Sequence, residues 1–270
     1  MPQSVARAKS YVSRPLALAS VAYLVKAVFL DLGDTLVYLD RPWEDVFRAN
    51  LRALCSYLSQ LGLRLDFQKF SQTFMRIFDD ASYHANLYKI EVPMEEILSK
   101  VLRKSGLQIL GVDLPTNAMI EFYRPEVESW QLYPDAIETL TQLSKGGYPM
   151  GLVSNSKSDW MVHAIVERCG LGKFLKSIVT SADLKVRKPR PEIFTEALNA
   201  LNVKPRDAIF VGDSIYADVA GSRNIGMRAV HVVRQPVDPA ALTRPDASIT
   251  NLAEVLEIIN KWNNLQVSNA

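Results

Sequence analysis

The sequence predicts an α/β fold: a doubly wound parallel-sheet (Rossmann-like) core with an inserted helical-bundle cap domain. Two observations lead to this prediction. Residues Tyr133–Trp262 alternate short apolar runs with amphipathic helical stretches, the pattern of a parallel sheet covered on both faces. Residues 41–130 instead show helical periodicity and no strong strand pattern. We therefore expect the helical block to interrupt the core.

The first predicted strand precedes the insertion. The segment VKAVFLDLGDTLVY (Val25–Tyr38) begins with a continuous β-branched and aromatic run, which is typical of a strand buried on both faces. This strand ends at Asp31, where a loop begins. Because it must join the sheet of the later strands, the core is predicted to be discontinuous. The predicted division is an extension at 1–24, the core at 25–40 and 131–262, the cap at 41–130 and a tail at 263–270.

Four helices are predicted in the cap. Apolar residues recur at helical spacing in Trp43–Leu61 and in Asp66–Tyr83. A third helix begins at Pro93, since proline is favoured in a first helical turn. Pro115 opens a fourth helix, which Pro125 should end or kink because proline lacks a backbone N–H. We interpret the leucine and aromatic content of these helices as packing core.

The part of the core that follows the cap is predicted to alternate strands with helices. The predicted strands are Pro149–Val153, Ser177–Thr180, Ala208–Val211 and Ala229–Val233, with a weak edge strand at Ala247–Thr250. The predicted helices are Ala136–Ser144, Trp160–Cys169, Glu192–Leu201, Ala217–Asn224 and Leu252–Trp262.

The composition argues against several classes of protein. The 31 Lys and Arg residues nearly balance the 29 Asp and Glu residues, so charge gives no case for a nucleic-acid partner. Cys55 and Cys169 cannot form a disulfide scaffold or a cysteine-based zinc site, and they fit a reducing compartment. The apolar stretch Leu16–Leu30 is too short and too interrupted to span a membrane. We expect a cytoplasmic monomer or homodimer that binds neither nucleic acid nor membrane.

Polar residues follow the predicted strands at their carboxyl ends, where ligands bind in open α/β sheets. A carboxylate there can act as a nucleophile, and carboxylates also ligate Mg²⁺. A lysine and hydroxyl groups suit the oxygens of a phosphoryl group. The pattern therefore indicates phosphoryl transfer. The residues concerned are Asp31, Gly33, Asp34, Thr35, Ser154, Asn155, Lys188, Asp213 and Asp218.

Four motifs occur in a recognisable order. They are D-x-x-x-T at Asp31–Thr35, GLVSN with Ser154, VRKPRPEIF with Lys188, and IFVGDSIYADVAGSRNIGM with Asp213 and Asp218. On these motifs the chain resembles the haloacid dehalogenase-like hydrolases that carry a helical cap. The resemblance covers about Val25–Trp262.

This resemblance implies a Mg²⁺-dependent hydrolase that acts on a small-molecule phosphate ester through an aspartyl-phosphate intermediate. It also implies a role for each residue. Asp31 would be the nucleophile and a metal ligand, and the Gly33 carbonyl and Asp213 would be further metal ligands. Ser154 and Asn155 would bind phosphate, and Lys188 would be a catalytic residue that neutralises phosphoryl charge. Thr35 and Asp218 would be supporting residues.

The sequence departs from the family pattern at one position. Family phosphatases usually carry a second Asp two residues after the nucleophile as general acid–base, a role worth about 10²–10⁴-fold in rate. Here Gly33 takes that position and Asp34 follows it. Three interpretations stay open: Asp34 is the acid–base, the enzyme is a slow phosphatase, or the chemistry differs.

The third interpretation is a carbon–halogen or carbon–phosphorus bond hydrolase of the same superfamily. A separate hypothesis, from a different class, is a weakly active relative that binds a phospho-ligand or a protein. Asp213 and Asp218 form the metal-binding version of the fourth motif, which favours a phosphate or phosphonate over a haloacid.

Overall fold

The core is built around a six-stranded sheet in which every strand is parallel to its neighbours. The structure, a computed structural model, describes residues 24–107, 114–234 and 243–267. The predicted α/β class is confirmed, and the strands predicted after the cap are all present within two residues of their expected ends. In sheet order the six strands are β5 (Leu175–Thr180), β4 (Met150–Ser154), β1 (Ala27–Leu30), β6 (Ala208–Gly212), β7 (Arg228–Val232) and β8 (Ala247–Ile249).

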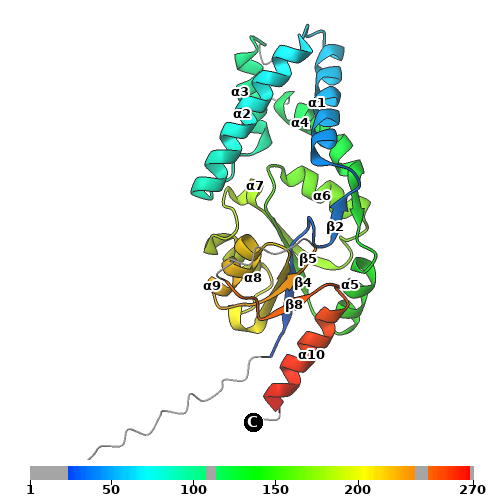
Figure 1. Ribbon diagram of the computed structural model, residues 1–270, viewed down its shortest axis with the longest axis vertical. Coiled ribbons are helices and arrows are strands. Elements are labelled where there is room, and N and C mark those ends of the chain that lie inside the picture. The colour runs from blue at the N-terminus through cyan, green and yellow to red at the C-terminus, as the bar shows by residue number, and fades with distance from the viewer. Residues whose placement is uncertain (1–23, 108–113, 235–242, 268–270) are drawn as a thin grey trace, which may run out of the picture.

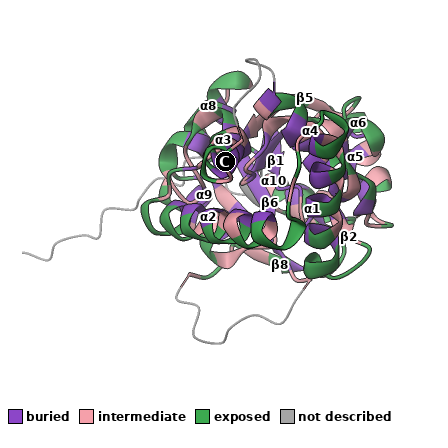
Figure 2. Cartoon of the chain, turned by 90° about the horizontal axis from the view of Figure 1, so that it is seen from above, coloured by how far each residue is buried: buried purple, intermediate pink, exposed green. Residues whose placement is uncertain are grey.

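Helices cover both faces of this sheet, as a doubly wound fold requires. Alternate residues of β1 point to opposite faces: Val28 and Leu30 join one apolar cluster, and Ala27 and Phe29 join the other. Figure 2 shows the buried residues gathered along the inner sides of the helices. The first face is covered by α5 (Ala136–Lys145), α6 (Asp159–Arg168) and α10 (Glu254–Val267), and the second by α8 (Pro191–Ala200), with α9 (Gly221–Asn224) beside it.

The cap is a bundle of four helices that stands above the core in Figure 1. Its interior is aromatic, since the ring of Phe74 lies 5.1 Å from that of Phe122 and Phe47 lies 5.7 Å from Phe122. These rings pack against one another, as expected for packing core. The helices are α1 (Trp43–Gln60), α2 (Phe67–Tyr88), α3 (Met94–Lys104) and α4 (Leu114–Ser129).

A short antiparallel ribbon, which the sequence analysis did not predict, connects the cap to the core. It pairs β2 (Val37–Leu39) with β3 (Trp130–Leu132), on either side of the insertion. Each strand has three residues, too few for a periodic pattern to stand out. Their pairing depends on the insertion bringing its two ends together.

Two local predictions need correction. Of the two outcomes expected at Pro125, an end or a kink of the helix, the first does not occur, since α4 continues to Ser129. Buried residues on both sides of the proline, among them Phe122 and Val127, pack the helix into the cap and offset the one missing N–H. The predicted helix Ala217–Asn224 is in fact a π-helical turn (Ile215–Ala220) followed by α9.

Other predictions concern the ends of the chain and its cysteines. Residues 1–23 of the predicted extension and 268–270 of the predicted tail lie outside the described residues. Cys55 and Cys169 are free thiols, as predicted. None of the helices that the structure describes is long and apolar enough to cross a membrane.

The cap contains a buried carboxyl group that makes stability depend on pH. Glu126 accepts a hydrogen bond from the Asn50 amide at 2.9 Å, yet burial raises the pKa of its carboxyl from 4.5 to about 7. The folded protein therefore holds this proton more tightly than the unfolded chain does. The contribution of Glu126 to the free energy of unfolding therefore falls as the pH rises from 4.5 through 7.

We expect Glu126→Gln, which cannot ionise, to remove this loss. Unfolding in urea should show the variant more stable than wild type by up to about 3 kcal/mol at pH 8 and nearly equal to it at pH 4. The exposed Glu128, on the same helix, supplies the control variant Glu128→Gln, for which no such pH dependence is expected. Equal stabilities of Glu126→Gln and wild type at pH 8 would contradict the prediction.

Candidate active site

A cavity of about 260 Å³ opens where β1, β4 and β6 end. Asp31 directly follows β1 and Asp213 directly follows β6, and these two strands are neighbours, so the two loops start side by side. The Asp31 amide continues the ladder by donating to the Val211 carbonyl at 3.0 Å. Of the predicted site residues, those that line the cavity are Asp31, Gly33, Asp34, Ser154, Asn155, Lys188, Asp213 and Asp218.

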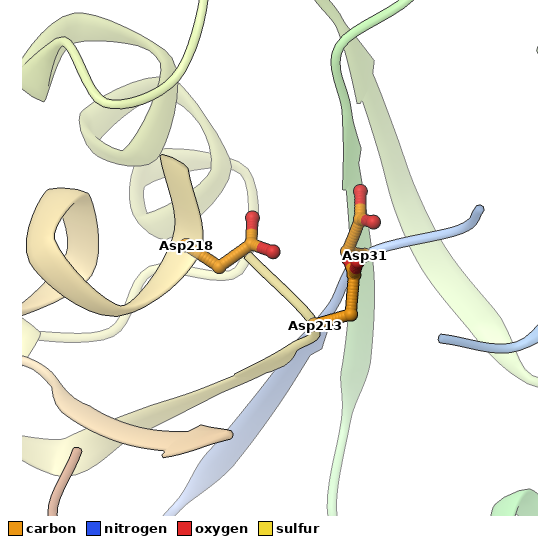
Figure 3. Close-up of side chains that lie close together, drawn as sticks. All are labelled: Asp31, Asp213 and Asp218. Atoms are coloured by element: carbon orange, nitrogen blue, oxygen red, sulfur yellow. The ribbon is translucent and has the colours of Figure 1, made fainter. Parts of the chain in front are cut away.

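Three carboxylates meet in this cavity. Asp31, Asp213 and Asp218 each offer an oxygen within 4.8 Å of the others (Figure 3). Burial raises the pKa of Asp31 to about 6, with Lys188 opposing the rise. Burial together with the charges of Asp31 and Asp218 raises the pKa of Asp213 to about 7. Such repulsion calls for a cation between the carboxylates.

The donor set fits Mg²⁺. Carboxylate and carbonyl oxygens are the ligands that this hard cation prefers. Among the described residues, none donates a hydrogen bond to the Asp213 carboxylate or forms an ion pair with it at contact distance, so its oxygens are available. Asp218 is less available, because Lys188 and the Ser214 amide already occupy its carboxylate.

Lys188 is a buried cation at the centre of the site. Its Nζ lies 2.6 Å from Asp31 Oδ1 and 2.7 Å from Asp218 Oδ1, and it donates to the Val153 carbonyl at 2.8 Å. Burial by itself would lower the pKa of this ammonium, but the two carboxylates outweigh burial, and the pKa is raised. Lys188 is therefore a fixed positive charge beside the oxygen of Asp31.

Asn155 joins two loops of the site. Its Oδ1 accepts from the Lys188 amide at 2.8 Å, and its Nδ2 donates to the Lys188 carbonyl at 3.1 Å. Both ends of this side chain are thus used to position Lys188. Ser154, the last residue of β4, is buried and also lines the cavity.

Gly212 is required by the position of Asp218. A Cβ at Gly212 would lie 2.4 Å from Asp218 Oδ2, closer than any side chain permits. The absence of a side chain lets the Asp218 carboxylate pass over β6 to reach Lys188 and the Ser214 amide, which it binds at 3.0 Å. Asp218 is thus placed as a supporting group behind Lys188.

Gly33 lies under an aromatic ring that comes from the far end of the insertion. A Cβ at Gly33 would stand 3.3 Å from Cη2 of Trp130, a tight contact that the indole could accept only by moving slightly. Trp130, the first residue of β3, also lines the cavity. The sequence does not single out Trp130, because no local pattern indicates which residue of the insertion reaches the first loop.

Asp34 faces the same cavity from an unusual backbone conformation. Its φ is +52°, and its amide donates to the Val37 carbonyl at 2.7 Å, which closes the loop. Asp34 lines the cavity and is open to solvent. The neighbouring protein still removes part of the water around its carboxyl group, which raises the pKa of that group. Its charge also contributes to the raised pKa of Asp213, so the two groups are near one another.

Two residues lie just outside the cavity. Thr35 is buried, and its Oγ1 has no hydrogen-bond partner among the described residues. The structure thus does not bring Thr35 to the cavity surface, in line with a role in shaping the loop. His231, which the sequence did not single out, lies with its Nε2 2.9 Å from the Asp213 carbonyl and so holds the Asp213 loop.

The fold and site together define a class of enzyme: a hydrolase with a Rossmann-like core that gathers a carboxylate, a buried lysine and an acidic cluster at the carboxyl edge of a parallel sheet. The family model for haloacid dehalogenase-like hydrolases matches residues 25–226. The chain belongs to this family, which confirms the resemblance described above.

Several known proteins are similar to this chain. It is 28% identical to the glyceraldehyde 3-phosphate phosphatase of Methanopyrus kandleri, over 88% of this chain and 98% of that one. It is 31% identical to the phosphoserine phosphatase of Thermus thermophilus, over 60% and 63% of the two chains. The crystal structure of a 2-haloacid dehalogenase from Pseudomonas syringae superposes with a TM-score of 0.65 at 25% identity, covering 88% of this chain and all of that one.

Proposed function

We propose that this protein is a Mg²⁺-dependent hydrolase of small phosphate monoesters. The observation that carries the proposal is the contact between Asp31 and the Lys188 ammonium, 2.6 Å apart in a cavity that holds two further carboxylates. The phosphatases among its relatives support this activity. A cavity of about 260 Å³ suits a small metabolite, and the two free thiols support a reducing, cytoplasmic compartment.

The reaction would take two steps. In the first, an Asp31 oxygen attacks phosphorus, the bond to the leaving-group oxygen breaks, and an aspartyl-phosphate forms. In the second, water attacks this phosphorus and frees Asp31 with inorganic phosphate. Lys188 and the Ser154 hydroxyl would balance the negative charge of the phosphoryl oxygens. Mg²⁺, held by Asp31, Asp213 and the Gly33 carbonyl, would supply further positive charge when bound.

Asp34 is our candidate for the group that moves the proton. It is a carboxyl group that lines the cavity and takes no part in the ion pairs that Lys188 forms with Asp31 and Asp218. It would give its proton to the leaving oxygen and then accept one from the attacking water. Trp130 supports this assignment, because the indole crowds the position at which a side chain of residue 33 would begin.

A dehalogenase is the second candidate. The similarity to a 2-haloacid dehalogenase and the glycine at position 33 favour it. The acidic cluster weighs against it, because a haloacid gives no reason to gather three carboxylates around a cation site. Carboxylates and the phosphate oxygens of a substrate are the ligands that commonly hold Mg²⁺.

The test is a product assay with and without metal. We expect wild-type protein with Mg²⁺ to release inorganic phosphate from p-nitrophenyl phosphate and from at least one ester in a metabolite panel. Excess chelator should abolish release, and added Mg²⁺ should restore it. Absence of phosphate from every ester would contradict the proposal, and metal-independent chloride release from 2-chloropropionate would establish the dehalogenase.

The role of Asp34 is tested by Asp34→Asn. We expect kcat to fall by about 10²–10⁴-fold for an ester with a poor, alkoxide leaving group, because the amide cannot donate the proton. With p-nitrophenyl phosphate the loss should be smaller, since that leaving group departs without protonation. If the variant matches wild type on both esters, Asp34 is not the acid–base.

A further inference from the structure

Glu91 is a fully buried carboxylate in the connection between α2 and α3 of the cap. Its side chain has no exposed surface. Oε1 accepts from Lys157 Nζ at 3.2 Å and from the Val92 amide at 3.1 Å. Oε2 accepts from Ser181 Oγ at 2.8 Å and from the guanidinium of Arg187. The cap thus places one anion between two cations of the core.

The two cations belong to the loops that carry Asn155 and Lys188, both of which line the cavity. Lys157 lies two residues after Asn155, and Arg187 directly precedes Lys188. Asn155 and Lys188 are themselves joined by a reciprocal pair of hydrogen bonds. Glu91 therefore connects the same two loops a second time, from the cap side.

Backbone hydrogen bonds reinforce this attachment. The Glu91 amide donates to the Lys185 carbonyl at 3.0 Å, and the Arg187 amide donates to the Lys89 carbonyl at 3.1 Å. On the other loop, the Met94 amide donates to the Lys157 carbonyl at 2.8 Å. The cap connection is thus paired with the core on both sides of the Glu91 carboxylate.

The negative charge of Glu91 balances the positive charges of Lys157 and Arg187. Burial lowers the pKa of Lys157, and the nearby positive charge of Arg187 adds to that effect, while Glu91 opposes it. Without Glu91, two partly buried cations would face one another with no anion between them. They would be expected to separate or to draw in water, and each would move its own loop.

We propose that Glu91 is a positioning residue: it holds the cap on the core and, by binding Lys157 and Arg187 together, aligns the loops of Asn155 and Lys188. It acts through these two cations and does not reach the cavity. The kinetic consequence rests on the proposed phosphatase function, whereas the alignment itself does not.

The test compares Glu91→Gln with Glu96→Gln. Glu96 also joins the cap to the core, through an exposed ion pair with Lys185 at 3.2 Å, so it is a matched control. Amide hydrogen exchange is followed by NMR at two reporters. The Arg187 amide reports the pairing with the cap, and the Lys188 amide reports the bond to Asn155.

We expect Glu91→Gln to speed exchange at both amides by about tenfold or more and Glu96→Gln to change neither by more than about twofold. We also expect Glu91→Gln to lower kcat for p-nitrophenyl phosphate about 10- to 100-fold, with a smaller effect on KM. Glu91→Asp, which keeps the charge, should recover most of both losses. A general loss of stability would instead speed exchange throughout the core.

The outcomes separate cleanly. Unchanged exchange at Arg187 and Lys188 in folded Glu91→Gln, or equal effects of the two variants, would overturn the proposal. Faster exchange in a protein that releases no phosphate would uphold the alignment and defeat the phosphatase function. If Glu91→Gln does not fold, Arg187→Gln removes one attachment only. Faster exchange at Lys188 is then expected, and its absence would overturn the proposal.

Discussion

Asp31→Asn is expected to reduce kcat for phosphate release by about 10⁴-fold or more, to near the background rate. The side-chain amide has the size of the carboxylate, but it cannot attack phosphorus or form the aspartyl-phosphate. The side chain at position 31 lies beside Lys188, and the backbone amide of the same residue donates to the Val211 carbonyl. Since the substitution keeps this backbone hydrogen bond, we expect the loop to keep its conformation. Steady-state assay with p-nitrophenyl phosphate and Mg²⁺ measures the effect.

The control for this variant is Asp40→Asn. Asp40 follows β2 and is exposed. Its Oδ1 lies 2.7 Å from Nε of Arg41, and Asp40 is not among the residues that line the cavity. We expect this variant to retain full activity. Circular dichroism and an unfolding curve should show Asp31→Asn folded. If Asp31→Asn retains activity comparable to wild type, Asp31 is not the nucleophile, and the two-step reaction proposed above is wrong.

Lys188→Met is expected to lower kcat/KM by about 10³-fold and also to destabilise the fold. The substitution keeps an unbranched chain over Phe210 but removes the charge that separates Asp31 from Asp218. Loss of one member of a buried ion cluster leaves the others uncompensated, at a cost of about 3–5 kcal/mol. Activity falls further because the phosphoryl oxygens lose a nearby cation.

Lys185→Met supplies the matched control for Lys188. Lys185 lies on the same loop, but its side chain is exposed and pairs with Glu96 on the surface. We expect this variant to change kcat/KM and the free energy of unfolding only slightly. Assay and urea unfolding of both variants are the measurements. If Lys188→Met stays within tenfold of wild type, the lysine is not part of the reaction.

The strands and most helices of the core were predictable because their patterns are local. A strand such as β1, buried between two layers of helices, must be an uninterrupted apolar run, and the helices between strands repeat apolar residues every three or four positions. Since parallel strands end at the same edge of the sheet, the polar residues after β1 and β6 could be expected to meet there. Asp31 and Asp213 do meet.

Other features could not be predicted, because they depend on contacts between distant segments. Pro125 has a strong local signal to end a helix, but tertiary packing of the cap outweighed it. Asn155 stays a predicted phosphate-binding residue, and the structure adds that both ends of its side chain bind the backbone of Lys188. The spacing of residues in the sequence predicts neither the continuation of this helix nor the hydrogen bonds of Asn155.

The sequence by itself determined the α/β core, the place of the insertion, and the loops that carry Asp31, Lys188 and Asp213. Only the tertiary structure decided what surrounds them: the indole of Trp130 over Gly33, and the Glu91 carboxylate between two loops of the core. The reason is physical. Local patterns record which residues must be buried or must end a strand, whereas the cap residue that meets a given loop is chosen by packing across the whole insertion.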